Sequence, residues 1–258
     1  MTEVHRDRTE PSPARNVSTA SSGSAETRPV MLKLPQARHW IIAAILLGAA
    51  VLVLGLTVQF LPGESVVELG VDQDLSRHHA AVLTAAAMVL NVAFGPLFGV
   101  GAIALIAVTV LLVRKSVADA IGFGVVAASG WAASEFFKLI IRRDRPNPGM
   151  LFDPLAPETG SNSFPSGHVS FAITLGFALY CLARETRWAR PAAAAGVVLA
   201  PVVAWSRLYI GVHYPTDVAA SFLAAGAALV LLTGLWNRFA ARILQRLPVN
   251  AATRQFLS

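Results

Sequence analysis

The stretch PSGHVSFAITLGFALYCLA, residues 165–183, joins a short polar motif directly to a long apolar run. Ser166 is a residue type preferred just before a helix, and Gly167 lets the backbone approach a ligand closely. No charged residue follows His168 up to Ala183. The first turn of a helix offers free N–H groups and the positive end of its dipole to an anion. The stretch therefore predicts an apolar helix whose first turn binds a phosphate group.

The whole chain shares this apolar character. Of its 258 residues 55% are hydrophobic and 14% are charged, whereas soluble domains carry about 25% charged residues. The net charge is +6, but the cations lie between apolar runs, which argues against nucleic-acid binding. The single cysteine, Cys181, excludes an internal disulfide and a cysteine-based metal site. The composition predicts an integral membrane protein.

The apolar runs predict an all-α fold, a polytopic membrane helix bundle with six transmembrane helices. A helix needs about 20 apolar residues to cross about 30 Å of hydrocarbon, and lipid offers its backbone groups no other partners. The predicted spans are residues 40–61, 94–113, 117–141, 168–183, 192–206 and 216–236. An amphipathic or interfacial segment is expected before the second span, where Asn91, Gly95 and Pro96 indicate a break.

A second polar motif lies at the end of the third span. Lys138 and Arg145 are seven residues apart, close to two helical turns, so their side chains share one face. Pro146 then ends the helix or starts a turn. Arginine makes bidentate contacts to phosphate, and lysine is a compact point charge. Taken alone, the pair is also compatible with ordinary cations at a membrane interface.

A third motif joins the last two spans. Ser206 and Arg207 end the fifth span, and His213 and Asp217 precede or begin the sixth. A carboxylate beside an imidazole fixes its tautomer and stabilises its protonated form. The other ring nitrogen of His213 is then usable as a nucleophile. Taken alone, these residues are also compatible with an acidic helix cap and a surface histidine.

Charge predicts the orientation of the bundle. If the amino terminus is cytoplasmic, fifteen of the 21 Lys and Arg residues lie on the inner side, as the positive-inside rule expects. Residues 1–38 are polar and are predicted to be a disordered cytoplasmic tail. Residues 39–240 are predicted to be the six-helix domain, and residues 241–258 a second cytoplasmic tail. This orientation puts all three motifs on the outer face of the plasma membrane.

Together the motifs closely resemble those of the type 2 phosphatidic acid phosphatase (PAP2) family. They read K-x6-R-P at 138–146, P-S-G-H at 165–168 and S-R-x5-H-x3-D at 206–217, and the resemblance covers about residues 40–236. It implies that His213 is the nucleophile and forms a phosphohistidine, that Asp217 orients it, and that His168 protonates the leaving group. The residues that it implies for phosphate binding are Lys138, Arg145, Ser166, Gly167 and Arg207.

The resemblance implies a lipid phosphatase of the plasma membrane that uses no cofactor. The substrates that it implies are phosphatidic acid, phosphatidylglycerol phosphate and polyprenyl diphosphate. The sequence shows no cage of Asp and Glu residues for Mg²⁺, which predicts metal independence. The alternatives are a phosphotransferase on the same scaffold and a non-catalytic lipid-phosphate binder or transporter. No oligomeric state is predicted.

Several polar residues near the motifs receive no catalytic role. Glu135 is interpreted as a structural partner of Lys138, one turn away on the same helix. The loop 147–163 either covers the site or shapes headgroup access. The residues interpreted as interfacial are Arg142, Arg143, His78 and His79, with the two arginines contacting lipid headgroups.

Overall fold

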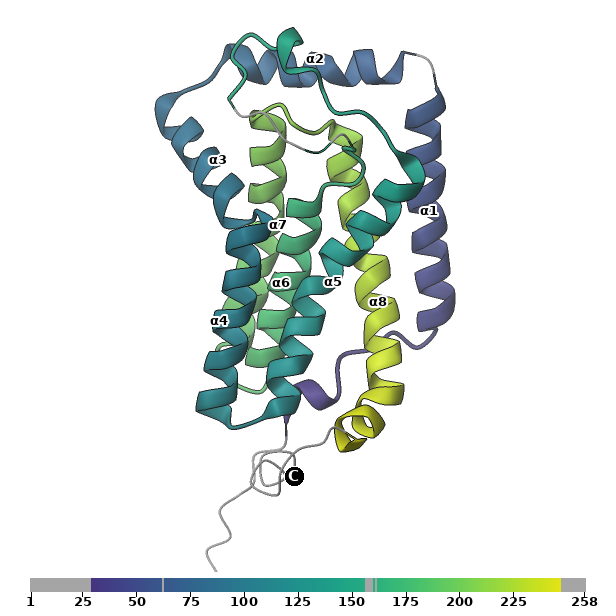
Figure 1. The fold of residues 1–258 in the computed structure, drawn as a ribbon, viewed down its shortest axis with the longest axis vertical. Helices are drawn as coiled ribbons and strands as arrows, with labels where there is room; N and C mark the ends of the chain where they lie inside the picture. Colours follow the sequence, from purple (N-terminus) through teal and green to yellow (C-terminus); the bar gives the residue numbers. More distant parts are fainter. Residues whose placement is uncertain (1–28, 62, 156–159, 161, 247–258) are drawn as a thin grey trace, which may run out of the picture.

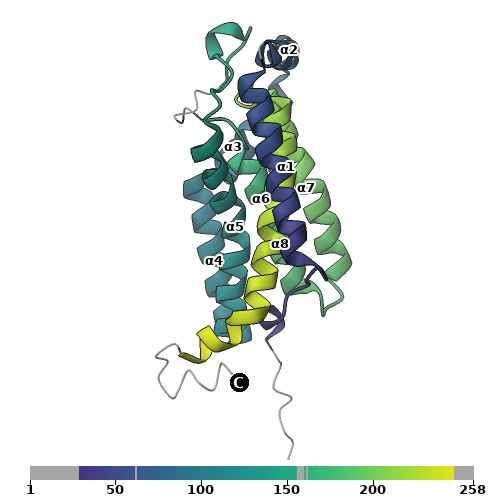
Figure 2. The same cartoon turned by 90° about the vertical axis from the view of Figure 1, so that its right-hand side faces the viewer.

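A computed structural model describes residues 29–61, 63–155, 160 and 162–246, and Figures 1 and 2 show its arrangement. The predicted all-α class is confirmed, because the described residues form helices and no strand beyond one isolated bridge. The helices are η1 (Val30–Leu32), α1 (Trp40–Phe60), α2 (Glu64–Arg77), α3 (Ala81–Ala93), α4 (Pro96–Arg114), α5 (Val117–Ile141), η2 (Pro148–Met150), α6 (Gly167–Ala183), α7 (Ala189–Tyr209) and α8 (Pro215–Arg246).

Each predicted span corresponds to a helix. Five of the described helices, α1, α4, α5, α7 and α8, are long and apolar enough to cross a membrane. The remaining one, α6, has 17 residues and packs against α5, α7 and α8. A helix surrounded by protein does not need the full length of a lipid-facing span, because its ends are covered by neighbouring helices. A multi-pass membrane protein follows, and the count of six crossings stays a prediction.

Two helices replace the single interfacial segment expected before the second span. Helix α2 lies across one end of the bundle, and α3 runs from it down to α4 (Figure 1). The predicted break is present, since Gly95 precedes α4 and Pro96 is its first residue, where the missing N–H of proline costs no hydrogen bond. We call the end of the bundle that α2 crosses the α2 end.

Small residues let the central helices approach closely. Trp131 of α5 stacks on Phe171 of α6, with 4.0 Å between ring centroids. A Cβ atom on Gly130 would overlap the backbone carbonyl of Ser170. The position of α6, and with it the motif at residues 165–168, therefore depends on a glycine in α5.

Replacing Gly130 by alanine is expected to lower the stability of the bundle by about 1–3 kcal/mol, the usual cost of forcing an atom into a packed core. The matched control is Gly101→Ala in α4, where an added Cβ meets nothing within 4 Å. Thermal unfolding of the purified proteins in detergent measures both. Equal midpoints for the two variants would contradict the close approach of α5 and α6.

The predicted amino-terminal tail differs from the structure in its last part. The short helix η1, which includes Met31, lies at the end of the bundle opposite α2 (Figure 1), and both Met31 and Leu34 are buried. The Met31 N–H donates to Asp119 at 2.7 Å, and the indole N–H of Trp236 donates to the Met31 carbonyl at 2.8 Å. These long-range contacts give a polar segment the partners that it lacks alone. Residues 1–28 and 247–258 lie outside the described residues, and α8 continues past the predicted domain end at 240.

Candidate functional site

Four helix ends that carry the sequence motifs meet below α2. Helices α5 and α7 end there, and α6 and α8 begin there (Figure 1). The two kinds of end differ electrostatically, because helix amino termini offer free N–H groups and attract anions. The three motifs, predicted to lie on one side of a membrane, therefore share one end of the bundle.

His213 lies between a cation and a carboxylate. Its side chain is buried, its Nε2 is 3.1 Å from Nη1 of Arg145, and its Nδ1 is 3.5 Å from Oδ2 of Asp217. A guanidinium only donates hydrogen bonds, so Nε2 is the acceptor and the proton of the neutral ring is on Nδ1, toward Asp217. The lone pair of Nε2 thus faces the Arg145 guanidinium, a group suited to bind phosphate, so a phosphate bound there would lie next to a nucleophilic nitrogen.

Arg145 is held by backbone groups on two sides. Its Nη1 donates to the Val212 carbonyl at 2.9 Å, and its Nε donates to the Gly160 carbonyl at 2.7 Å. The side chain itself is half-buried. These bonds orient the guanidinium next to His213.

Asp217 is fully buried in the first turn of α8. Its Oδ2 accepts from the Tyr214 N–H at 3.0 Å, and its Oδ1 accepts from Nη1 of Arg143 at 2.8 Å. The interpretation of Arg143 as a cation in contact with lipid headgroups is therefore wrong. The Arg143 side chain is 2% exposed and also donates to Glu68 at 2.5 Å. Buried ionic partners, unavailable from the local sequence, turn it inward.

The amino group of Lys138 lies close to the first turn of α6. Its Nζ donates to Glu135 at 2.8 Å, which confirms that predicted pair, and a Cβ atom on Gly167 would lie 3.7 Å from Nζ. The Ser166 N–H donates to the Ser221 hydroxyl at 2.9 Å. The Ser166 hydroxyl is buried and has no hydrogen-bond partner among the described residues. A cation, a hydroxyl and a helix amino terminus thus lie together, as a phosphate site requires.

Asn91 of α3 joins His168 to Arg207. The Asn91 carbonyl oxygen is 3.1 Å from Nε2 of His168, and because a carbonyl only accepts, Nε2 carries a proton. The side-chain oxygen of Asn91 accepts from Nη1 of Arg207, which is fully buried. From the sequence alone Asn91 indicates only a helix break, so its contacts with His168 and Arg207 were not predicted. A polar amide inside an apolar helical run was the available signal.

His79 ties the loop after α5 to α7. Its Nδ1 is 2.8 Å from Oδ2 of Asp153, and its Nε2 is 2.9 Å from the Tyr209 carbonyl. The His79 side chain is 7% exposed, so the interfacial interpretation is wrong for this residue, whereas His78 is exposed. His79 therefore links the described part of the loop to α7 at the α2 end. Residues 156–159 and 161 of that loop lie outside the described residues.

All eight predicted site residues lie at the α2 end. Those joined through the contacts of His213 and of the first turn of α6 are Lys138, Arg145, Ser166, Gly167, His213 and Asp217. His168 and Arg207 meet through Asn91, and His168 follows Gly167 directly in the chain. The chemical roles of these residues stay predictions.

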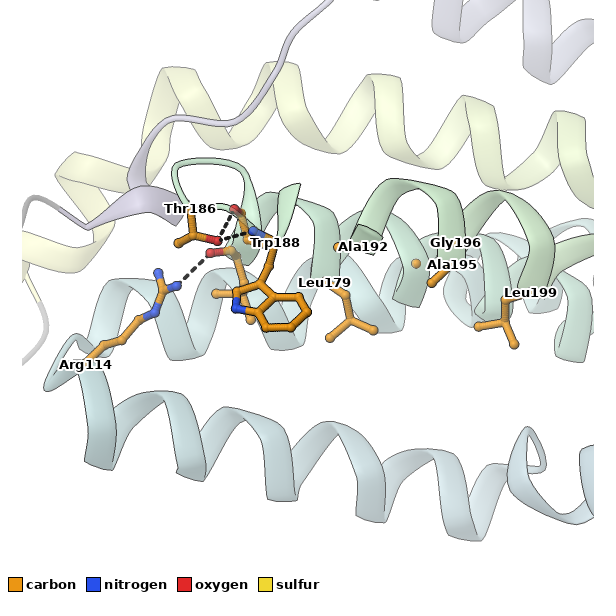
Figure 3. Close-up of a pocket in the computed structure, with 11 residues that line it drawn as sticks. Arg114, Leu179, Thr186, Trp188, Ala192, Ala195, Gly196 and Leu199 are labelled. Carbon is orange, nitrogen blue, oxygen red and sulfur yellow. Dashed lines mark hydrogen bonds between the residues drawn. The ribbon is translucent and has the colours of Figure 1, made fainter. Parts of the chain in front are cut away.

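The described residues contain no group of three or more His, Cys, Asp or Glu that could hold a metal ion. A cavity of about 430 Å³ lies at the other end of the bundle, between Arg114 of α4 and the junction of α6 and α7 (Figure 3). Its walls are mostly apolar, with Leu179, Trp188 and Leu199 among them. None of the eight predicted residues lines this cavity, so it is separate from the candidate site.

Comparisons with known proteins agree with the motifs. Residues 119–240 match the model of the PAP2 superfamily. An Escherichia coli (strain K12) protein named putative undecaprenyl-diphosphatase YbjG is 30% identical over 128 residues, which are 50% of this chain and 60% of that protein. The decaprenylphosphoryl-5-phosphoribose phosphatase of Mycolicibacterium smegmatis is 39% identical over 100 residues, which are 38% of this chain and 49% of that protein. The chain thus spans about half the length of these relatives.

A solved structure shares the fold. The crystal structure of a transmembrane PAP2 type phosphatidylglycerolphosphate phosphatase from Bacillus subtilis matches with a TM-score of 0.64. The match covers 76% of this chain and 96% of that chain, at 23% sequence identity. The arrangement of the helices is therefore that of a known membrane fold.

Proposed function

We propose that this protein is a membrane lipid phosphatase that hydrolyses a phosphate monoester or diphosphate, because residues 119–240 match the model of the PAP2 superfamily. The observation that carries the proposal is the position of His213, with Nε2 beside Arg145 and Nδ1 beside Asp217. A buried histidine between a carboxylate and a cation is suited to attack a bound phosphate. The cations and the first turn of α6 supply the positive charge that phosphoryl transfer needs.

In the first step, Nε2 of His213 attacks phosphorus, and the bond from phosphorus to the leaving oxygen breaks. A phosphohistidine forms, and Asp217 stabilises the positive charge that develops on the ring. His168 gives a proton to the leaving oxygen. Because Nη1 of Arg145 is 3.1 Å from Nε2 in the structure, substrate binding has to move the guanidinium from the nitrogen to the phosphate oxygens.

In the second step, water attacks the phosphohistidine. His168, now neutral, takes a proton from the water, the phosphorus–nitrogen bond breaks, and inorganic phosphate leaves. Lys138, Arg145 and Arg207 offset the charge on the phosphate oxygens in both steps. Since these fixed cations do the work that Mg²⁺ does in other phosphoryl transfers, we propose that the reaction needs no metal ion.

The proposed location is the plasma membrane, with both termini cytoplasmic and the α2 end outside. The charge distribution supports this orientation, because fifteen of the 21 Lys and Arg residues then lie inside. A lipid substrate keeps its tail in the bilayer while its phosphate enters below α2. The described loop segment that His79 fastens over the α2 end lies on the headgroup side in this orientation.

The test is phosphate release by the purified protein from a lipid panel with excess chelator. The panel holds polyprenyl diphosphate and monophosphate, phosphatidic acid and phosphatidylglycerol phosphate, with the polyprenyl lipids first because two relatives are named for such substrates. Release from at least one lipid is expected, and the chelator should not reduce it. No release from any would contradict the proposal, and loss with chelator would contradict metal independence. An acceptor alcohol added to the same assay reveals a phosphotransferase by its phosphorylated product.

A further inference from the structure

Helix α2 turns its polar face toward the protein. The residues on its inner side include Ser65, Glu68 and Asp72, whereas Val66 and Val67 are 72% and 74% exposed. A surface helix ordinarily buries its apolar face and exposes its polar one. Leu69 is buried as well, but the polar side chains on the inner side mean that α2 does not owe its place to apolar burial alone. Its inner polar groups need partners in the bundle, and these partners lie at the candidate site.

Glu68 caps the helix that carries Asp217. Its Oε1 accepts from the Thr216 N–H at 2.9 Å, and its Oε2 accepts from the Thr216 hydroxyl at 2.8 Å. Thr216 lies in the first turn of α8, directly before Asp217. The first N–H groups of a helix have no partner inside it, and a carboxylate there also meets the positive end of the dipole. A side chain of α2 therefore supplies the cap of α8.

Arg143 joins this cap to the candidate catalytic carboxylate. Its Nη2 lies 2.5 Å from Oε2 of Glu68, and its Nη1 lies 2.8 Å from Oδ1 of Asp217. The guanidinium also lies over the Tyr214 ring, 4.1 Å from its centre. The two oxygens of Asp217 thus have separate tasks, because Oδ1 faces Arg143 and Oδ2 lies 3.5 Å from Nδ1 of His213.

A second carboxyl group of α2 lies near the same cluster. Asp72, also on the inner side of α2, is fully buried, and its carboxyl oxygens have no hydrogen-bond partner among the described residues. Burial, followed by the nearby charges of Asp217 and Glu68, raises the pKa of Asp72 to about 8, so it is protonated at neutral pH. Glu68 and Asp217 then share one cation, Arg143. A protonated Asp72 adds no negative charge of its own, so the Arg143 guanidinium pairs only with Glu68 and Asp217 in this cluster.

We infer that Glu68 and Arg143 are positioning residues of the proposed reaction, and that α2 belongs to the catalytic unit although it lies outside the residues that the family model matches. Glu68 neutralises Arg143 and caps α8, and Arg143 holds Asp217 in the orientation that serves His213. Buried ion pairs contribute little to stability compared with apolar residues of the same size. This cluster accordingly serves the orientation of His213 more than the stability of the fold.

Glu68→Gln tests the inference, which rests on the proposed function for its kinetic part. The amide keeps the shape of Glu68 but not its charge. We expect kcat to fall about 10- to 100-fold, which is the loss typical when a residue that orients a metal ligand is replaced in other enzymes. KM should change less than about 2-fold, since no substrate contact is lost. In an Asp217→Asn background the same change should have no further effect, because the two residues act in series. Equal losses in both backgrounds would overturn the inference, as would an unchanged kcat.

The matched control is Asp74→Asn, which removes an exposed carboxylate from the same helix and should leave kcat unchanged. Thermal unfolding identifies variants that fail to fold, and Glu68→Asp, which keeps the charge, should recover part of the loss. The ¹⁵N NMR signals of the His213 ring provide a readout that needs no turnover. They should shift in Glu68→Gln and not in Asp74→Asn, and unshifted signals would overturn the inference. An inactive wild-type protein with the expected shifts would overturn the proposed function alone.

Discussion

Replacing His213 by alanine is expected to abolish phosphate release and to lower kcat/KM by about 10⁴-fold or more, the scale seen when a catalytic nucleophile is removed. The reason is that, among the described residues of the α2 end, no other group is placed like Nε2, which lies 3.1 Å from a guanidinium. The other ring nitrogen, Nδ1, faces Asp217. The residual rate would come from substrate bound by the cations without covalent catalysis. Release of labelled phosphate from the best lipid of the panel measures the loss.

A direct readout of the covalent step comes from rapid quenching with labelled substrate. The wild-type protein should carry label that is stable to base and labile to acid, as a phosphohistidine is, and the His213→Ala protein should carry none. His78→Ala is the matched control, because His78 is exposed and its Nδ1 contacts only a backbone carbonyl of its own helix in the described contacts. Turnover retained in His213→Ala, or label present in it, would remove His213 as the nucleophile.

The sequence was sufficient to predict the six long apolar helices and to place the eight candidate residues at one end of the bundle. Long apolar runs have few alternatives to helices in a membrane, and the motif residues lie next to one another in the chain or one to two turns apart. Chemistry that is local in sequence, such as the pair of His213 and Asp217, can be recognised without knowing how the helices pack.

Contacts between distant segments could not be predicted in the same way. Arg142 and Arg143 are neighbours of the same type, yet Arg142 is exposed at the left-handed end of α5 with φ 54° and Arg143 is buried. The difference arises because Arg143 pairs with Glu68, which is 75 residues away in the chain. Asn91 reaches Arg207 across 116 residues. Neither pairing can be recognised from residue spacing or composition in the sequence. Both form only because α2 and α3 pack against the ends of α7 and α8 in the folded protein.

Replacing His168 by alanine is expected to lower kcat/KM for a phosphate monoester by about 10³-fold, within the usual range for a general acid. For a diphosphate kcat/KM should fall only about 10-fold, below that range. An alcohol leaves poorly unless its oxygen is protonated as the bond to phosphorus breaks. A phosphate leaving group stabilises its own negative charge and needs that proton much less. His168 is placed for the task, since it follows Gly167 in the first turn of α6 and is oriented by the carbonyl of Asn91.

The measurement compares kcat/KM for polyprenyl monophosphate and polyprenyl diphosphate, which share a tail and differ in the leaving group. His213→Ala is the reference, because loss of the nucleophile should affect both substrates alike. A nitrophenyl phosphate, whose leaving group needs no proton, should respond to His168→Ala as the diphosphate does. If His168→Ala slowed all three substrates equally, His168 would act in phosphate binding and not as the acid. A loss confined to the monoester would instead mean that proton transfer by His168 sets the preference between monoester and diphosphate. The cations of the site would then bind the phosphate group of both substrates.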